Sequence, residues 1–256
     1  MNIGISTSCF YPAITEKTLE RIARLGFKQI EVFVNAPSES TISYASRFKQ
    51  MADSYQLNVV AFHPFSSFAE SYCLFGEYER RRQDFYDIYR EYFAAAATMG
   101  ANVFNFHGCR SDWPVSQEKY WDVYHTLFRL AQKEGIRFSQ ENVNRHYCSS
   151  PDYILNMRQA LQHDLYFTFD VKQAMRSGED PCAVRDAMGE HLIHFHVSDY
   201  QETGACALPG KGICSYETIL NKHLRSDAVS KVIEVYATDY TNDSQLREAA
   251  NFMNKL

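Results

Sequence analysis

Six acidic or imidazole side chains stand at the ends of apolar, β-rich runs of this sequence. Val-Val-Ala-Phe precedes His63, for example, and Phe-Thr-Phe precedes Asp170. A charged or polar side chain beside such a run is costly to bury unless a partner compensates it. These positions are therefore the first candidates for chemistry: His63, His107, Glu141, Asp170, His196 and Glu234.

Four of these side chains could bind one divalent metal ion together: Glu141, Asp170, His196 and Glu234. Three carboxylates at one point repel each other and are driven partly neutral, and a divalent cation removes that conflict. Three carboxylates with one imidazole suit Mn²⁺, Mg²⁺, Co²⁺ or Zn²⁺. Taken singly, such a carboxylate is more often a helix cap or salt-bridge partner, and a buried histidine is more often a core residue. The metal prediction therefore depends on the elements that carry the four residues.

A repeated theme in the sequence indicates what those elements are. Around Gly26, Gly100 and Gly135, a helical pattern stops at the glycine and a β-rich run follows almost at once. Glycine just past a helix end relieves the left-handed strain that terminates helices. The theme is therefore the helix-to-strand half of a β–α repeat. Apolar residues at helical spacing predict helices from about Thr15 and about Tyr78 and over 120–130, and Ser150-Pro151 is a good helix start.

Eight short strands alternate with these helices, and most are apolar on both faces. Such runs suit parallel strands that are covered on both sides. No Pro/Gly/Ser-rich linker divides the 256 residues, so we predict an α/β fold: a single (β/α)8 TIM barrel domain over 1–256. A doubly wound sheet is the alternative, but it normally has a glycine-rich turn after its first strand. The predicted strands are Asn2–Ser6, Gln29–Phe33, Asn58–His63, Asn102–His107, Arg137–Glu141, Tyr166–Asp170, Leu192–Val197 and Lys231–Val235.

The barrel determines where the candidate residues meet. All carboxyl ends of its strands converge on one mouth, where the active sites of such barrels lie. Predicted strands five to eight are consecutive around the ring, so they direct the four candidate ligands toward a shared point. His194 lies deeper than His196 on the same strand face and is expected to be a core histidine. Glu31 ends the second strand without an evident partner, so we expect a structural role. Asp199 could support the site or cap a helix.

Composition excludes several classes of function. The net charge is −5, and the one basic run, Arg80–Arg82, is flanked by acidic residues and is typical of a solvated helix face. We therefore expect no nucleic-acid partner. Seven cysteines without a C-x-x-C pair suit reduced thiols. The opening residues do not resemble a signal peptide, and no apolar stretch reaches the length of a membrane span, so we expect a cytoplasmic protein without a membrane partner.

The strand-end residues resemble those of the xylose isomerase-like barrel superfamily, in its sugar (phosphate) isomerase/epimerase branch. The resemblance runs through nearly the whole chain, and its order and spacing are more specific than any single motif. The motifs are Ser6-Thr-Ser, Glu31 after Gly26, His63-Pro64, His107-Gly108, Glu141-Asn142, Asp170, His194-x-His196-x-x-Asp199, Pro209-Gly210-Lys211-Gly212 and Ile233-Glu234.

The resemblance implies a metal-dependent enzyme. It implies one divalent ion on the four candidate ligands, with Glu141 and Glu234 as paired acid/base groups. A sugar or sugar derivative would bind the metal through adjacent oxygens, and proton abstraction next to its carbonyl would give an enediolate. His63 and His107 would hydrogen-bond substrate hydroxyls. Aromatic side chains of the loops could pack against the sugar, or only against their own loops: Phe10, Tyr11 and Trp113.

This chain departs from the superfamily pattern at two places. Many members have Asp-x-x-His after the sixth strand, whereas this chain has Gln173, which can hydrogen-bond a sugar oxygen but cannot shuttle a proton. Free-ketose epimerases tend to have an arginine after the histidine of the seventh strand, and the stretch after His196 has none. A ketose 3-epimerase is therefore not assigned. Arg145 and Lys172 could meet an anionic group of the substrate or be solvated surface charges.

Four functions remain open at this point. An isomerase or epimerase of a sugar or sugar derivative is favoured. An inosose-type dehydratase begins with the same proton abstraction, and product mass separates the two because dehydration loses one water. An apurinic-site endonuclease with several zinc ions is disfavoured by Gln173 and by the charge of −5. A non-catalytic sugar-binding barrel would keep the pocket without turnover. The metal, the substrate, its stereochemistry and the oligomeric state stay open.

Overall fold

The eight predicted strands form a closed parallel barrel in a computed structural model that describes residues 2–256. Their order around the ring is β1-β10-β7-β6-β5-β4-β3-β2, and β1 pairs with β10 to close it. The predicted (β/α)8 barrel is confirmed. The barrel strands are β1 (Ile3–Ser6), β2 (Gln29–Phe33), β3 (Asn58–His63), β4 (Val103–Phe106), β5 (Arg137–Glu141), β6 (Tyr166–Asp170), β7 (Leu192–Val197) and β10 (Ser230–Ile233).

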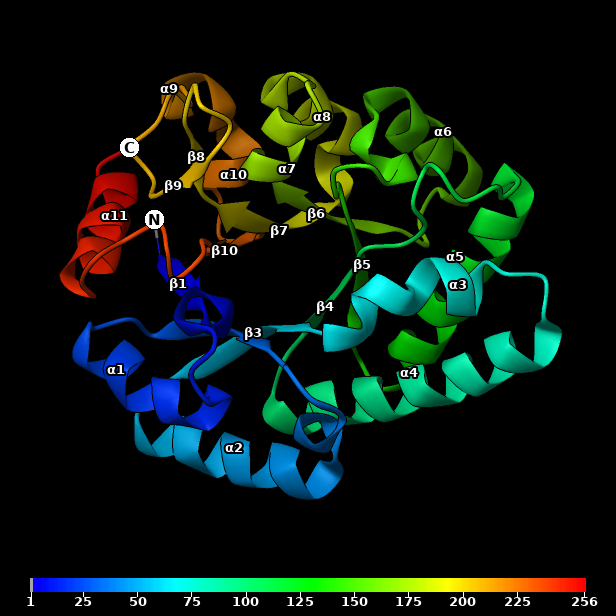
Figure 1. Ribbon diagram of the computed structural model, residues 1–256, viewed down its shortest axis with the longest axis horizontal. Coiled ribbons are helices and arrows are strands. Elements are labelled where there is room, and N and C mark those ends of the chain that lie inside the picture. The colour runs from blue at the N-terminus through cyan, green and yellow to red at the C-terminus, as the bar shows by residue number, and fades with distance from the viewer. Residues whose placement is uncertain (1) are drawn as a thin grey trace.

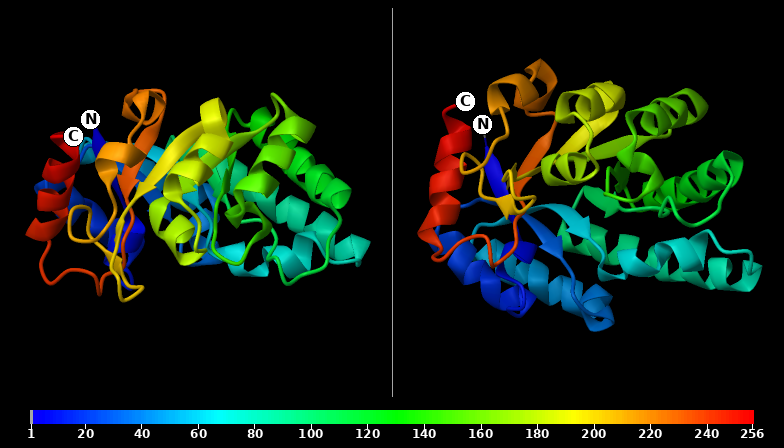
Figure 2. Two further views of the ribbon diagram at one scale, coloured as in Figure 1. Left: turned by 90° about the horizontal axis from the view of Figure 1, so that it is seen from above. Right: turned by 45° about the horizontal axis from the view of Figure 1, so that its top comes forward.

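Helices surround this barrel on its outside (Figures 1 and 2). The last helix lies beside the first strand in these views, so the two ends of the chain meet where the ring closes. None of the helices within residues 2–256 is long and apolar enough to cross a membrane. The helices are α1 (Thr18–Arg24), α2 (Ile42–Ser54), α3 (Glu70–Leu74), α4 (Glu79–Met99), α5 (Gln117–Lys133), α6 (Pro151–Leu161), α7 (Val171–Arg176), α8 (Pro181–Met188), α9 (Tyr216–Ile219), α10 (Lys222–Arg225) and α11 (Ser244–Asn254).

Local sequence explains where several helices begin and end. Helix α4 stops at Gly100, whose φ of 90° is a left-handed conformation that glycine adopts without a Cβ clash. Helix α6 begins with Pro151 in its first turn, as predicted, but the preceding Ser150 makes no capping hydrogen bond with its side chain to any described residue. The helix predicted from about Thr15 starts as a 3-10 turn over Thr15–Lys17 and continues as α1.

Aromatic side chains fill much of the layer between strands and helices. Phe104 and Phe106 of β4 project outward, where they pack against Tyr89 of α4 and Phe138 of β5. Side chains alternate along a strand, so Asn105 between them projects into the barrel. The helices therefore pack against the strand faces that carry the large apolar residues. The opposite faces line the barrel interior with buried polar side chains.

The connection between β7 and β10 contains a small two-stranded ribbon that the sequence did not predict. Its strands are β8 (Asp199–Tyr200) and β9 (Cys206–Ala207). The carboxylate of Asp199 accepts hydrogen bonds from the backbone N–H groups of Gly210 and Cys214, so this residue organises a loop rather than capping a helix. A Cβ on Gly212 would collide with the backbone carbonyl of Tyr200 and with this carboxylate, which explains a glycine there.

Candidate active site

The four predicted metal ligands meet at the carboxyl ends of the barrel strands. Glu141 and Asp170 end β5 and β6, His196 lies near the end of β7, and Glu234 directly follows β10. These strands are neighbours in the ring. One ligand atom from each residue lies within 4.8 Å of the others. The structure therefore brings together the residues that sequence reasoning grouped.

The imidazole of His196 has two very different sides. Its Nε2 lies 2.9 Å from a Glu31 carboxylate oxygen, so Nε2 carries the proton. Its Nδ1 faces Oε2 of Glu234 at 3.3 Å and oxygens of Glu141 and Asp170 at 3.6 Å. Among residues 2–256, this buried Nδ1 has no hydrogen-bond partner. Burial opposes a charged ring, but the carboxylates of Glu234, Glu31 and Glu141 raise the pKa of His196 well above its usual range. The carboxylate-facing side of this ring therefore requires a positive charge.

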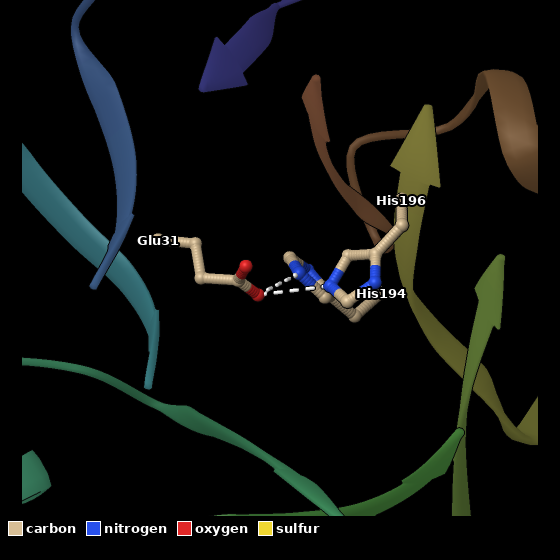
Figure 3. A group of neighbouring side chains, drawn as sticks. All are labelled: Glu31, His194 and His196. Atoms are coloured by element: carbon tan, nitrogen blue, oxygen red, sulfur yellow. Dashed lines mark hydrogen bonds and ion pairs between the residues drawn. The ribbon is translucent and has the colours of Figure 1, made fainter. Parts of the chain in front are cut away.

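Glu31 is the centre of a network that crosses the barrel interior (Figure 3). Its Oε2 accepts hydrogen bonds from Nε2 of His194 at 3.0 Å, from Nε2 of His196, and from the side-chain amide of Asn105 at 2.5 Å. Burial disfavours its charge, yet His196 and His194 hold the pKa of Glu31 well below its usual range. The expectation that Glu31 lacks partners is thus wrong. His194 is a buried, hydrogen-bonded core histidine, as expected, and also contacts Ser230.

Lys172 is buried among the ligands and is not a solvated surface charge. It lies in the first turn of α7, and its Nζ donates hydrogen bonds to Oδ2 of Asp170 and Oε2 of Glu234, both at 2.5 Å. Burial disfavours the ammonium, but Asp170 and Glu234 raise the pKa of Lys172 well above its usual range. The other Asp170 oxygen accepts the backbone N–H of Gln173 at 3.0 Å and caps α7. The sequence did not predict the ion pairs of Lys172 with Asp170 and Glu234, because a lysine side chain two residues after a strand is flexible.

A cavity of about 450 Å³ opens directly above these ligands. Four of the predicted substrate-binding residues lie on its wall: His63, His107, Lys172 and Gln173. Three residues that the sequence analysis did not single out, Phe33, Phe65 and Tyr236, add aromatic surface. The described lining is Ser8, Tyr11, Phe33, Asn35, His63, Phe65, His107, Glu141, Lys172, Gln173, Glu234, Val235 and Tyr236.

The structure places two predicted substrate-binding residues, Trp113 and Arg145, away from this cavity wall. Trp113 packs edge-on against Tyr72, with ring centroids 6.0 Å apart. Arg145 is exposed, and its carbonyl accepts the backbone N–H of Ser111. Trp113 is partly buried against the hydrophobic core. The loops after β4 and β5 pair with each other between Arg110 and His146, next to Arg145. Of the other loop aromatics considered, Tyr11 reaches the cavity and Phe10 is buried in the core.

The two histidines on the wall lie beside Glu141. Nε2 of His63 and Nε2 of His107 are 3.0 Å apart, so one of them donates to the other. They also lie 3.6 Å and 3.4 Å from Oε2 of Glu141. Burial opposes charge on both sides of this contact, but Glu141 raises the pKa of His63, and His196 and His107 lower that of Glu141 well below its usual range. Glu141 is therefore held as a carboxylate facing the cavity.

The chemistry of the donor set fits a divalent cation. Glu141 Oε2 and His196 Nδ1 are buried without hydrogen-bond partners among the described residues, and Asp170 and Glu234 supply further oxygens. Two more groups have metal-ligand geometry, and each shares a residue with the first: His63, His107 and Glu141, and Glu31, His194 and His196. In the latter group, the hydrogen bonds of Glu31 already use the Nε2 atoms of both histidines. The four-residue group therefore remains the best candidate for one ion.

Comparisons with known proteins agree with this architecture. An inosose dehydratase from Clostridium beijerinckii is 21% identical over an alignment of 236 positions, and the match covers 80% of this chain and 76% of that protein. The structure of a D-tagatose 3-epimerase-like protein superimposes with a TM-score of 0.79 at 18% identity, covering 100% of this chain and 96% of the other. A probable 3-DHS dehydratase from Bacillus anthracis gives 0.78 at 13% identity and covers 99% of each chain. Identities this low show the shared fold alone.

A match to a family profile covers most of the sequence. The profile of the xylose isomerase-like TIM barrel aligns with residues 19–256, which include all the candidate ligands and every residue of the cavity wall except Ser8 and Tyr11. The resemblance first noted at the strand ends is thereby confirmed. The chain belongs to the xylose isomerase-like TIM barrel family.

Proposed function

We propose that this protein is a divalent-metal-dependent isomerase or epimerase of a sugar or sugar derivative. The proposal rests on the placement of two carboxylates, Glu141 and Glu234. Both line one cavity, and an oxygen of one lies within 4.8 Å of an oxygen of the other. Two carboxylates so placed can remove a proton from a bound substrate and return one to it.

The metal and the carboxylates have separate tasks in this proposal. A divalent ion held by Glu141, Asp170, His196 and Glu234 would polarise adjacent substrate oxygens and acidify the neighbouring C–H bond. One of the two glutamates removes that proton, which leaves an enediolate, and the other returns a proton to a carbon of it. His63 and His107 lie 3.6 Å and 3.4 Å from Oε2 of Glu141 and hold it as a carboxylate, and from the cavity wall they would hydrogen-bond substrate hydroxyls.

The remaining wall suits a sugar-sized ligand. Gln173 lies on it with its side-chain oxygen on the backbone N–H of Asn144, so its amide N–H₂ remains to donate to a hydroxyl. Aromatic rings can pack against the C–H face of a sugar. The rings on the wall are those of Tyr11, Phe33, Phe65 and Tyr236.

A dehydratase acting on a keto-polyol is the second candidate. The similarity to an inosose dehydratase favours it, as does the fold shared with a probable 3-DHS dehydratase. Both reactions begin with loss of a proton next to a carbonyl, and they diverge when the dehydratase expels a hydroxyl as water. The endonuclease alternative gains no support, because the net charge of −5 opposes a DNA surface. A non-catalytic sugar-binding barrel would show binding without turnover.

The experiment is a substrate screen in D₂O with Mn²⁺, using ketoses, inososes and sugar phosphates. Mass spectrometry of the product then separates two outcomes. Isomerisation or epimerisation adds deuterium and leaves the carbon skeleton unchanged, whereas dehydration removes one water. A protein that binds members of the panel but neither exchanges nor converts them would be a sugar-binding barrel, and the proposal would be wrong.

Substitution of the two glutamates tests the acid/base assignment. We expect Glu141→Gln and Glu234→Gln each to lower turnover about 10²–10⁴-fold, the usual contribution of a positioned acid or base. Because each substitution also removes a ligand, bound Mn²⁺ is quantified in the same samples and rates are compared at saturating metal. Glu217→Gln, at an exposed position, is the matched control. Unchanged turnover in both site variants would refute the assignment.

A further inference from the structure

The ammonium of Lys172 occupies the side of the ligand group that a metal ion would need. It donates to Oδ2 of Asp170 and Oε2 of Glu234, each at 2.5 Å. These are the same two oxygens that face Nδ1 of His196 at 3.6 Å and 3.3 Å. The ammonium of Lys172 therefore already binds two of the four predicted ligands, through the oxygens that face His196.

The two oxygens of Asp170 have different partners. Its Oδ1 accepts the backbone N–H of Gln173 at 3.0 Å and caps helix α7. Oδ2 is the oxygen that faces Nδ1 of His196, so an ion held between these two residues meets the ammonium at Oδ2. Two cations that share one carboxylate oxygen in a buried site repel each other strongly, because little water is present to screen them.

The negative charges of the cluster exceed the single positive charge of Lys172. Four carboxylates, Glu31, Glu141, Asp170 and Glu234, lie in contact with the imidazole of His196. Lys172 offsets one of these four negative charges. Nδ1 of His196 and Oε2 of Glu141 are buried and have no hydrogen-bond partner among residues 2–256, the ammonium included. Lys172 thus neutralises part of the group but leaves these two atoms unsatisfied, and an ion bound to Nδ1 of His196 would share the oxygens of Asp170 and Glu234 with the ammonium.

We propose that Lys172 is a tethered competitor of the divalent ion, which stabilises the metal-free site and lowers its affinity for metal. Ion binding turns the ammonium away from Asp170 and Glu234 toward the cavity, whose wall Lys172 already forms. The inference rests on the proposed metal dependence, and it assigns to Lys172 a role in setting the metal concentration at which the ion binds. The metal-free form is thereby ordered by a side chain of the protein itself.

Metal titration tests this role without any substrate. Mn²⁺ is titrated into metal-free protein and free Mn²⁺ is followed by electron paramagnetic resonance, with calorimetry in parallel. We expect Lys172→Met, which keeps the apolar stem and removes the charge, to bind Mn²⁺ at least tenfold more tightly than the wild type. Lys172→Arg, which keeps the charge, is expected to bind no more tightly than the wild type. Lys133→Met, at an exposed position near the end of α5, controls for the change in net charge.

Thermal unfolding supplies a second readout. Metal-free Lys172→Met is expected to melt below the metal-free wild type, because Asp170 and Glu234 lose their only ammonium partner among the described residues. Saturating Mn²⁺ is expected to raise its melting temperature by more than it raises that of the wild type. If Lys172→Met does not fold, Lys172→Gln, which also lacks the charge, takes its place in both measurements.

The outcomes separate this inference from the proposed function. Equal or weaker Mn²⁺ affinity in the uncharged variant, with normal binding by the wild type, overturns the competitor role and leaves the proposed function standing. Tight binding by the variant without any turnover of the substrate panel leaves the competitor role standing and counts against the proposed function. Absence of Mn²⁺ binding in every variant, including the uncharged one, overturns both.

Discussion

At the scale of single residues, the chemistry of the site depends on how His196 is held. Its Nε2 is hydrogen-bonded to Glu31 at 2.9 Å, which leaves Nδ1 toward the three carboxylates. A histidine that binds metal through one nitrogen commonly donates the other N–H to a carboxylate, and this contact fixes both tautomer and ring orientation. Glu31 therefore acts on the candidate metal site through His196 without reaching it.

Replacement of Glu31 measures this positioning role. We expect Glu31→Gln to lower Mn²⁺ affinity about 10–100-fold, the usual effect of losing such a partner. The amide offers only one accepting atom and adds donors that oppose the N–H groups of His194 and His196. Calorimetric titration of Mn²⁺ gives the affinity, and circular dichroism of the metal-free form checks that the fold is retained. Glu217→Gln provides the exposed comparison. A folded Glu31→Gln protein with unchanged affinity would show that the ring needs no such support.

Sequence reasoning identified the residues whose position follows from a strand end. Glu141, Asp170, His196 and Glu234 could be grouped because neighbouring parallel strands end at one mouth. Glu31 was assigned no partner, because pairing across a barrel depends on its shear and tilt, which a strand pattern does not contain. The ion pairs of Lys172 with Asp170 and Glu234 could not be predicted for a different reason: four flexible bonds separate its ammonium from a helical backbone, so periodicity does not say where the charge lies.

At the scale of elements, the short helix α3 holds the loop that follows β4. Glu70 of α3 accepts the backbone N–H of Gly108 and the hydroxyl of Tyr89 in α4, each at 2.6 Å. This carboxyl is buried, and burial raises the pKa of Glu70 to about 8 in spite of these two donors. His63 lowers this pKa and Glu141 raises it, both by charge. Glu70 thus supports the backbone beside His107 and is itself a titrating group.

The raised pKa of Glu70 predicts a pH dependence of stability. The unfolded chain loses this proton near pH 4.3, whereas the folded chain keeps it to about pH 8. Between these values the folded state binds the extra proton, so its stability falls as pH rises, by about 1.4 kcal/mol per pH unit from this group. We expect Glu70→Gln to remove that contribution. Urea unfolding at several pH values from 5 to 8 gives the two slopes.

The difference between the slopes isolates Glu70, because every other titrating group is common to both proteins. Glu217→Gln is expected to retain the wild-type slope, since its side chain is exposed. If the wild type and Glu70→Gln lose stability in parallel over this range, Glu70 is ionised in the folded protein at neutral pH and the predicted linkage is wrong.

Strands were predicted more reliably than the segments that join them. Five predicted strands have the bounds observed, because apolar runs between polar ends define both limits: Gln29–Phe33, Asn58–His63, Arg137–Glu141, Tyr166–Asp170 and Leu192–Val197. The two-residue strands β8 and β9 are too short to show any alternation. The carboxylate of Asp199 in β8 binds the backbone N–H groups of Gly210 and Cys214, more than ten residues away, and local sequence does not reveal such contacts.

At the scale of the whole molecule, the candidate ion connects four consecutive barrel strands. Its ligands come from β5, β6 and β7 and from the residue after β10, and β10 pairs with β1 where the ring closes. The ligand group is not assembled in an unfolded chain, because 93 residues separate Glu141 from Glu234 (234 − 141). An ion bound there therefore stabilises the folded barrel against unfolding.

Thermal unfolding with and without metal tests this coupling. At a Mn²⁺ concentration about 100 times the dissociation constant, binding adds about 2.7 kcal/mol, which for a domain of this size raises the melting temperature by about 5–10 °C. Chelation with EDTA is expected to reverse the shift. Asp170→Asn keeps an oxygen that can cap α7 but removes a charged ligand, so its shift should be much smaller. Asp180→Asn, which alters the exposed cap of α8, should keep the full shift. Equal shifts in the two asparagine variants would mean that Mn²⁺ stabilises the barrel from a site that does not include Asp170.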